Sequence, residues 1–256
     1  MLPMRFSALL SLMLLGCSSS EASSTPTDAG ATEAATDAEL TGTKCGAPPY
    51  VKWSGQATIK DGSGSNKPAD GAKLTSDSCP GTTLTLGADG KFELLLTKGV
   101  KSVGRLEKEG SLKNLLGEWQ PDADQADISL VLLPNIFAGL VSGWDPSTEP
   151  ALVLQVSPAN GATGACADPS GVSVSVTGQP SAKITYYDEG SIPTPIDGAT
   201  ASGKSGVISV TKVTGSMMDV VGTKTGCKVS LKTRLQSGRI ALAPQYLTTA
   251  IAETSN

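Results

Sequence analysis

The chain has 256 residues, a formal net charge of −4 and no histidine. The absence of an imidazole excludes the Ser-His-Asp and Cys-His catalytic systems. No basic cluster stands apart from acids, which argues against a nucleic-acid partner. No stretch reaches the roughly 20 apolar residues that a membrane-spanning helix needs.

The first 17 residues have the pattern of an export signal. Arg5 precedes an apolar core from Phe6 to Leu15, and the small residue Gly16 precedes Cys17. The ending Leu-Leu-Gly-Cys resembles the lipobox of bacterial lipoproteins. The resemblance implies that residues 1–16 are a lipoprotein signal peptide and that Cys17 is the acylated first residue of the mature protein. The alternatives are an ordinary signal peptide or a buried helix that carries a cysteine.

Residues 17–44 are predicted to be a disordered tether behind the lipid. They are mostly Ser, Thr, Ala, Gly and acids, so they cannot bury enough surface to offset the entropy of ordering. The three acyl chains that the lipoprotein resemblance implies give firm anchorage. Ser18 stands where enteric lipoproteins retained in the inner membrane carry aspartate. The predicted location is therefore the bacterial cell envelope, lipid-anchored in the outer membrane.

From Tyr50 onward, short runs alternate between apolar and polar residues and are separated by Gly, Asp, Asn, Ser and Pro. Such alternation predicts half-buried strands, and many strands at regular spacing favour antiparallel sandwiches. Two alternating runs, one ending at Leu86 and one starting at Phe92, flank a Gly-Ala-Asp-Gly segment at 87–90. This arrangement predicts a β-hairpin.

The predicted fold class is all-β, with two antiparallel β-sandwich domains at 45–133 and 151–256. Residues 134–150 interrupt the alternation and are assigned to an interdomain connection, in which Asn135 is placed to cap a short helix. One large domain is the alternative, but the mid-chain break and two pairs of cysteines favour two.

Residues 50–133 resemble the carboxypeptidase regulatory-like family, whose modules are seven-stranded, transthyretin-like sandwiches. The similarity lies in Pro-Ala-Asp-Gly-Ala-Lys-Leu-Thr at 68–75 and in Leu-Gly-Ala-Asp-Gly-Lys-Phe at 86–92. Residues 151–252 carry a weaker resemblance, without the Asp-Gly hairpin. The family's modules are accessory domains that bind, space or stabilise, so the resemblance implies no catalytic residues.

Beyond Cys17 the chain has four cysteines, Cys45, Cys79, Cys166 and Cys227. In an exported protein an even number suggests two disulfides, and four cysteines allow three pairings. Because two lie in each predicted domain, we expect Cys45 to bond Cys79 and Cys166 to bond Cys227; free thiols are the alternative. Neither Cys-x-x-Cys spacing nor histidine accompanies them, so no metal site is predicted.

Two kinds of motif fragment are interpreted as coincidental. Ser209 and Lys212 have S-x-x-K spacing, and the segment at 224–226 spells K-T-G, as in penicillin-recognising enzymes. Here the serine lies in a strand pattern rather than at the start of a helix, and no S-D-N segment occurs. The Asp-rich segments at 61–66 and 122–127 lack the glycine and glutamate of a calcium loop, so we interpret them as turns.

Exposed aromatic rings are the basis for a possible carbohydrate site. The candidate contacts are Trp119, Trp144, Tyr186 and Tyr187. Since neighbouring strand residues point to opposite faces, one of the two tyrosines is expected at the surface. The other interpretation of the tryptophans is that Trp53 and Trp119 seal the ends of the first sandwich.

The predicted function is a non-catalytic, lipid-anchored cell-envelope protein with a structural, adhesive or binding role. The alternative is a carbohydrate-binding surface lipoprotein that uses exposed aromatics. The expected partners are the membrane, through the lipid, and an envelope polysaccharide or another surface protein. No cofactor, metal or nucleic acid is expected.

Overall fold

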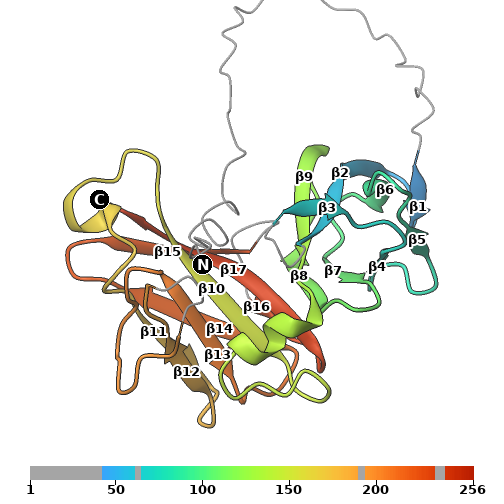
Figure 1. The fold of residues 1–256 in the computed structure, drawn as a ribbon. Helices are drawn as coiled ribbons and strands as arrows, with labels where there is room; N and C mark the ends of the chain where they lie inside the picture. Colours follow the sequence, from blue (N-terminus) through green and yellow to red (C-terminus); the bar gives the residue numbers. More distant parts are fainter. Residues whose placement is uncertain (1–41, 61–64, 190–193, 234–239) are drawn as a thin grey trace, which may run out of the picture.

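A computed structural model describes residues 42–60, 65–189, 194–233 and 240–256. Cys17, the signal peptide and nearly all of the predicted tether lie outside the described residues. The described chain consists mainly of strands with two short 3-10 helices, as Figure 1 shows, which confirms the all-β prediction. Within this part of the chain, no helix is long and apolar enough to cross a membrane.

The first half of the described chain contributes strands to two sheets. Its strands are β1 (Thr43–Cys45), β2 (Tyr50–Lys60), β3 (Asn66–Pro68), β4 (Lys73–Ser76), β5 (Thr83–Thr85), β6 (Lys91–Thr97), β7 (Ser102–Glu107), β8 (Lys113–Trp119) and β9 (Gln125–Leu132). A five-stranded sheet has the order β1-β6-β2-β3, with β9 also paired to β2. Strands β8, β7, β4 and β5 form one end of a nine-stranded sheet.

The second half completes the nine-stranded sheet and adds a third sheet. Its elements are the 3-10 helices η2 (Asn135–Leu140) and η3 (Gly164–Ala167), and the strands β10 (Ala151–Pro158), β11 (Ser173–Thr177), β12 (Lys183–Tyr186), β13 (Val207–Thr211), β14 (Met217–Thr223), β15 (Lys228–Thr233), β16 (Ile240–Ala241) and β17 (Tyr246–Ser255). The full sheet order is β12-β13-β10-β17-β8-β7-β4-β5, with β15 also on β17. The third sheet is β11-β14-β16.

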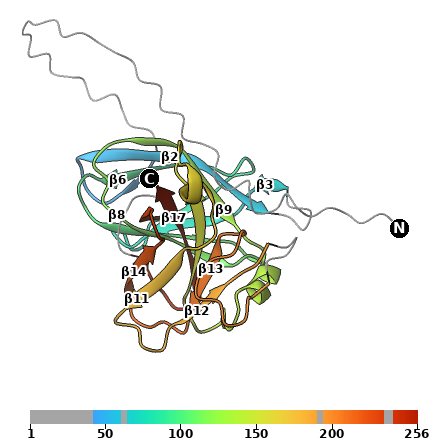
Figure 2. The same cartoon turned by 90° about the vertical axis from the view of Figure 1, so that its left-hand side faces the viewer.

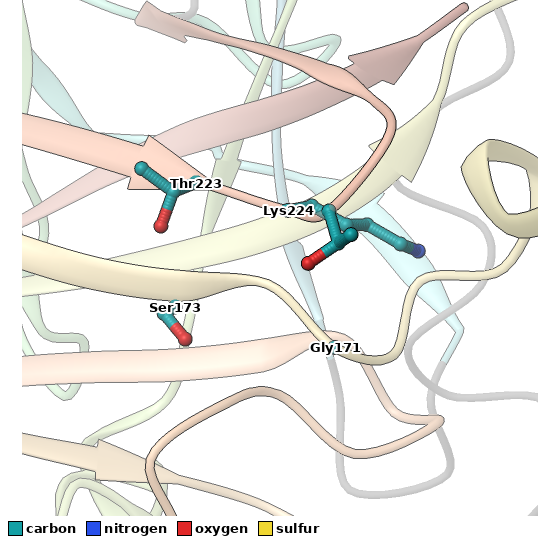
Figure 3. Close-up of a pocket in the computed structure, with 5 residues that line it drawn as sticks. Gly171, Ser173, Thr223 and Lys224 are labelled. Atoms are coloured by element: carbon teal, nitrogen blue, oxygen red, sulfur yellow. The ribbon is translucent and has the colours of Figure 1, made fainter.

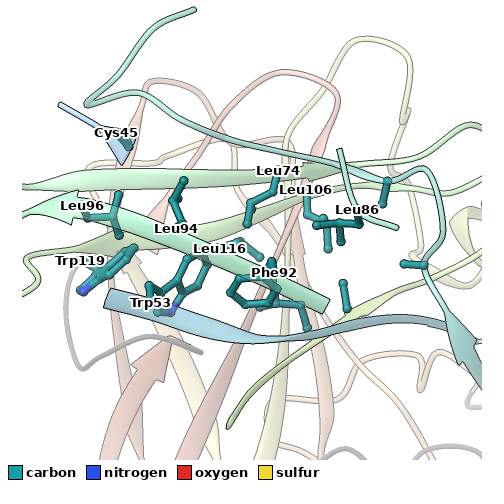
Figure 4. Packing of buried hydrophobic residues seen from close by; sticks show 14 of the residues in the cluster. Cys45, Trp53, Leu74, Leu86, Phe92, Leu94, Leu96, Leu106, Leu116 and Trp119 are labelled. Carbon is teal, nitrogen blue, oxygen red and sulfur yellow. The ribbon is translucent and has the colours of Figure 1, made fainter. Parts of the chain in front are cut away.

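Each half has its own hydrophobic core between two sheets. In the first, alternate residues of β2 and β6 point toward Leu74, Leu106 and Leu116 of the opposing sheet (Figure 4). Trp53 lies at the centre, with ring centroids 4.8 Å from Phe92 and 4.9 Å from Trp119. The second core lies between β10, β13 and β17 on one side and β11 and β14 on the other. The two layers in each half follow from the period-two alternation.

One strand joins the two halves. β17 runs parallel to β10 over eight residue pairs, from Ala151–Leu247 to Pro158–Thr254. On its other edge it pairs first with β8, in parallel, and then with β15, antiparallel. The first half (blue to green) and the second half (yellow to red) therefore lie side by side in Figures 1 and 2 with a continuous sheet between them.

Most strand pairs are antiparallel, as predicted, but the sheets also contain parallel pairs that the sequence analysis did not predict. Four pairings are parallel: β1 with β6, β2 with β9, β10 with β17, and β17 with β8. Parallel neighbours cannot be joined by tight turns, so they bring together strands that are distant in the chain. Sequence alternation identifies strands but carries no information about which distant strands pair.

Two local predictions also need correction. The segment at 87–90 is a turn but not a hairpin turn, since β5 pairs with β4 and β6 pairs with β2 and β1. The turn carries the chain from one sheet of the first half to the other. The predicted helix at the connection is the 3-10 helix η2; its N-cap position is Pro134, with no side-chain cap, and Asn135 is already inside it.

Candidate functional site

The four aromatic residues predicted to contact carbohydrate are all buried. Their exposed fractions are 3% for Trp119, 8% for Trp144, 5% for Tyr186 and 1% for Tyr187. Rings this deeply buried cannot stack on a sugar, so the predicted aromatic platform is wrong. Trp53 and Trp119 lie together in the first core, where their contact area stabilises the fold.

Both tyrosines are buried because both faces of their strand are covered. Tyr186 belongs to the second core, and its hydroxyl accepts a hydrogen bond from the Val174 backbone at 3.0 Å. Tyr187 points the other way, where the hydroxyl accepts a 2.9 Å hydrogen bond from the Ser142 backbone and lies 3.0 Å from Ser209 Oγ. The connection between the halves therefore covers the face that the sequence analysis assigned to solvent.

A third, smaller core fills the junction between the halves. It contains Leu112, Val141, Trp144, Ala151 and Leu247, which come from the start of β8, the connection, β10 and β17. Trp144 is fixed there by a 2.8 Å hydrogen bond from its indole N–H to the Glu149 carbonyl. The junction is thus a packed interface, and the connection that enters it is not a free linker.

The two predicted disulfides are both present. Cys45 bonds Cys79 with a Cα–Cα distance of 5.2 Å, and Cys166 bonds Cys227 with a distance of 5.6 Å. Both distances are ordinary for disulfides. The first bond ends β1, so it lies where the chain from the predicted tether joins the folded part. Each bond closes within its own half.

The penicillin-enzyme motif fragments do not form a catalytic group. Ser209 is buried beneath Tyr187, and the Lys212 ammonium is committed to the Glu149 carboxylate at 2.7 Å. The Lys224 ammonium of the K-T-G segment donates a hydrogen bond to the Asp168 carbonyl. Each lysine therefore has a structural partner, in agreement with the interpretation of these fragments as coincidental.

A polar hollow lies beside Lys224 on the second half. Gly171, Ser173, Thr223, Lys224 and Thr225 line a volume of about 290 Å³, and Figure 3 shows the Ser173 and Thr223 hydroxyls projecting from neighbouring strands. Ser173 and Thr223 are directly paired partners of β11 and β14. Ser173 Oγ already donates to the Thr200 carbonyl at 2.8 Å. The Ser173 hydroxyl and the Lys224 ammonium of this hollow are therefore already used within the fold.

A second hollow, of about 340 Å³, lies at the junction. It is lined by Ser111, Leu112, Lys113, Asn135, Ala138, Pro146 and Gln245. These residues come from the start of β8, the helix η2, the turn after Trp144, and the residue before β17. We name this volume, with those seven lining residues, the junction hollow. It is the candidate site because four separate segments of the chain meet there.

Local backbone bonds fix the segments around the junction hollow. The amide of Asn135 donates to the Gly110 carbonyl at 3.0 Å, and the amide of Gln245 donates to the Glu149 carbonyl at 3.1 Å. Asp145 closes its turn by accepting bonds from Ser147 and Thr148. These hydrogen bonds, those from Ser147 first, lower the pKa of the Asp145 carboxyl.

Two cations lie near one aromatic ring beside the junction hollow. Lys113 Nζ is 5.7 Å and Arg105 Cζ is 6.0 Å from the centroid of the Tyr246 ring. Lys113 also donates a 3.1 Å hydrogen bond to Gln245 Oε1. Among the described residues, neither cation has a carboxylate partner in an ion pair.

The Glu107 carboxylate accepts a hydrogen bond from the Tyr246 hydroxyl. Burial, followed by this hydrogen bond and the Glu107 charge, raises the pKa of Tyr246 far above its ordinary value. Tyr246 therefore stays protonated and keeps Glu107 as its acceptor.

Sequence analysis missed Lys113, Gln245 and Tyr246, because nothing in their local sequence marks them. They become neighbours only when β8 and β17 pair, with Tyr246 opposite Lys113. In the part of the chain that the structure describes, no group of three or more metal-ligating side chains is found.

Comparisons with known proteins give no family for this chain. No family model matches it, and no curated protein matches it. Similar solved structures include a minor pilin of Streptococcus agalactiae, at 12% identity, TM-score 0.25 and coverage of 80% of this chain and 96% of the pilin. The shaft pilin SpaA of Lactobacillus rhamnosus GG has 12% identity, TM-score 0.25 and coverage of 81% and 98%. A streptococcal ancillary pilin has 14% identity, TM-score 0.22 and coverage of 80% and 62%.

TM-scores of this size carry no argument about function or ancestry. The resemblance to carboxypeptidase regulatory-like modules stays a prediction from the sequence, since no family model supports it.

Proposed function

We propose that this protein is a non-catalytic, lipid-anchored protein of the bacterial cell envelope with a structural or adhesive role. Acylation of Cys17 would hold it in the outer membrane, and residues 17–44 would act as the tether. The observation that carries the proposal is the shared strand β17, which makes the two halves one continuous body. Such continuity suits a surface protein that transmits load between its anchor and a partner.

The disulfide between Cys45 and Cys79 supports this role. Force from the lipid would reach the folded part at β1, and the bond would pass it directly to Cys79. Residues 46–78, which lie between the two cysteines, therefore carry no tension as long as the disulfide is intact. β1 also pairs in parallel with β6, a strand of the first core.

The way in which reactive side chains are used supports a non-catalytic role. Ser209, Lys212 and Lys224 are each bound to a structural partner within the fold. A nucleophile needs an adjacent base within hydrogen-bond reach, and the S-x-x-K residues do not provide one for each other. The partner of an adhesive role would be another surface protein or an envelope polysaccharide.

The anchoring part of the proposal is tested by Cys17→Ala in the native host. We expect loss of metabolic palmitate labelling and accumulation of the uncleaved precursor. Ser18→Asp should keep the labelling but move the protein to the inner-membrane fraction, and Ser19→Ala is the control that should change neither. Unchanged palmitate labelling of Cys17→Ala would contradict the proposed anchor.

A further inference from the structure

The junction hollow has the size and position of a small-molecule site. Its volume of about 340 Å³ is at the lower end of the range for ligand pockets, roughly 300–1,000 Å³. It also lies where two hydrophobic cores meet, a common position for such sites. The structural role proposed above does not require a hollow at this place.

The polar lining of the hollow is rich in hydrogen-bond donors. The Lys113 ammonium has three N–H groups and uses one of them on Gln245 Oε1. The contact with Lys113 engages only the oxygen of the Gln245 side-chain amide, so its NH₂ group offers two further donors. Asn135 adds a second side-chain amide, and no carboxylate is among the lining residues. Such a set suits an anionic group with several acceptor oxygens.

Two features of the lining are unusual. Ser111 is 6% exposed, and its buried hydroxyl has no hydrogen-bond partner among the described residues, as is also true of the Thr185 hydroxyl. Buried hydroxyls are almost always hydrogen-bonded. Gln245 has a φ of 71°, which a residue other than glycine adopts at an energetic cost, as Asp127 and Lys212 also do in this chain.

The remainder of the lining is apolar and compact. Leu112, Ala138 and Pro146 provide aliphatic surface without an aromatic ring to stack on. In the 3-10 helix, residues three apart lie on the same face, so Asn135 and Ala138 face the hollow together. A ligand that fits has a charged acceptor group at one end and a small aliphatic body at the other.

We propose that the junction hollow binds a compact organic carboxylate. The Lys113 ammonium and the amides of Gln245 and Asn135 hold the carboxylate, and the aliphatic body lies against Leu112, Ala138 and Pro146. This site is independent of the lipid anchor, so it can fail while the anchoring proposal holds, and the reverse is also true.

The test uses isotope-labelled full chain in detergent and two matched probes. N-acetyl-L-alanine carries the carboxylate, and N-acetyl-L-alaninamide has nearly the same shape without the charge. We expect saturable chemical-shift changes at Lys113, Asn135 and Gln245 with the acid, and at least tenfold weaker binding of the amide. A second pair of probes, glucuronate and glucose, repeats the comparison for a sugar acid. Comparing the two acids shows whether the uncharged part of the ligand is peptide-like or sugar-like.

Two variants locate the binding. Lys113→Met removes the charge, and Gln245→Glu supplies Lys113 with an internal carboxylate; each should weaken acid binding about tenfold or more. Lys91→Met removes an exposed lysine on β6, outside the hollow, and should leave binding unchanged. Equal binding of acid and amide, full binding by Lys113→Met, or no saturable binding of either carboxylate up to about 50 mM would overturn the proposal.

Discussion

Tyr187 determines how the connection between the halves is held against the nine-stranded sheet. Its hydroxyl accepts a hydrogen bond from the partly buried Ser142 backbone and lies against the buried Ser209 hydroxyl. The backbone N–H of Ser142 in the connection therefore bonds to Tyr187, the residue that follows β12, and not to water. Together with the packing of Val141 and Trp144 in the third core, this hydroxyl ties residues 141–144 to the sheet.

Tyr187→Phe should lower the free energy of unfolding by about 1–2 kcal/mol, because it removes the acceptor of the partly buried Ser142 N–H and the partner of the buried Ser209 hydroxyl. The control is Tyr50→Phe, since the Tyr50 hydroxyl donates to the Gly46 carbonyl at an exposed position and water can replace it. Urea unfolding followed by tryptophan fluorescence measures both. Equal losses in the two variants would show that Tyr187 does not fix the connection.

The exposure of single residues was the least predictable property of this chain. Alternation correctly places Tyr186 and Tyr187 on opposite faces of a strand. It does not say whether a face meets solvent, a second sheet or a connection, and here both faces are covered. The junction hollow was unpredictable for the same reason, because Lys113 and Gln245 are 132 residues apart and meet only through strand pairing.

At the scale of elements, the turn at 87–90 shows what local signals can determine. Gly90 has a φ of 68° as the turn signal predicts, but the turn joins two sheets. A Cβ on Gly90 would lie 2.3 Å from the Ala57 carbonyl oxygen, so β2 passes directly beside the turn. The turn and its two flanking strands could be predicted, whereas the partners of those strands could not.

Gly90→Ala should destabilise the protein more than Gly110→Ala does. Gly110 has a similar φ of 77°, but a Cβ there meets nothing within 4 Å. Gly110→Ala therefore reports the cost of the left-handed backbone alone, about 1–2 kcal/mol. Gly90→Ala adds a clash with the Ala57 backbone. Chemical denaturation should therefore show a loss in the free energy of unfolding at least twice as large as that of Gly110→Ala. Similar losses would mean that β2 does not approach the turn so closely.

The disulfides are elements that the sequence allowed us to predict. Two cysteines in each half, in an exported chain, favour bonds within each half, and both occur. Replacing Cys166 and Cys227 together with alanine should cost about 4 kcal/mol, since the bond closes a loop with a sequence separation of 61. Thermal unfolding with and without reductant measures this cost, and a loss below about 1 kcal/mol would contradict it. Non-reducing peptide mapping checks the pairing itself.

At the scale of the whole molecule, the final strand joins the two halves. β17 has β10 on one edge, and β8 and then β15 on the other. The sequence predicted the strands and the break near residues 134–150, but it offered no sign of a sheet shared across that break. Pairing between strands so distant in sequence depends on the completed packing of both cores and on the junction cluster.

Stretching single molecules between Cys17 and Asn256 tests the central claim, that the two halves form one load-bearing body. Once β17 detaches, the nine-stranded sheet loses the strand that joins β10 of the second half to β8 of the first, so we expect one main rupture that unfolds both halves together. The intact disulfides should shorten the released length by about 120 Å and about 210 Å, for loops with sequence separations of 34 and 61 at roughly 3.5 Å per residue. Two well-separated ruptures, with residues 42–133 still folded after the second half has opened, would contradict the account.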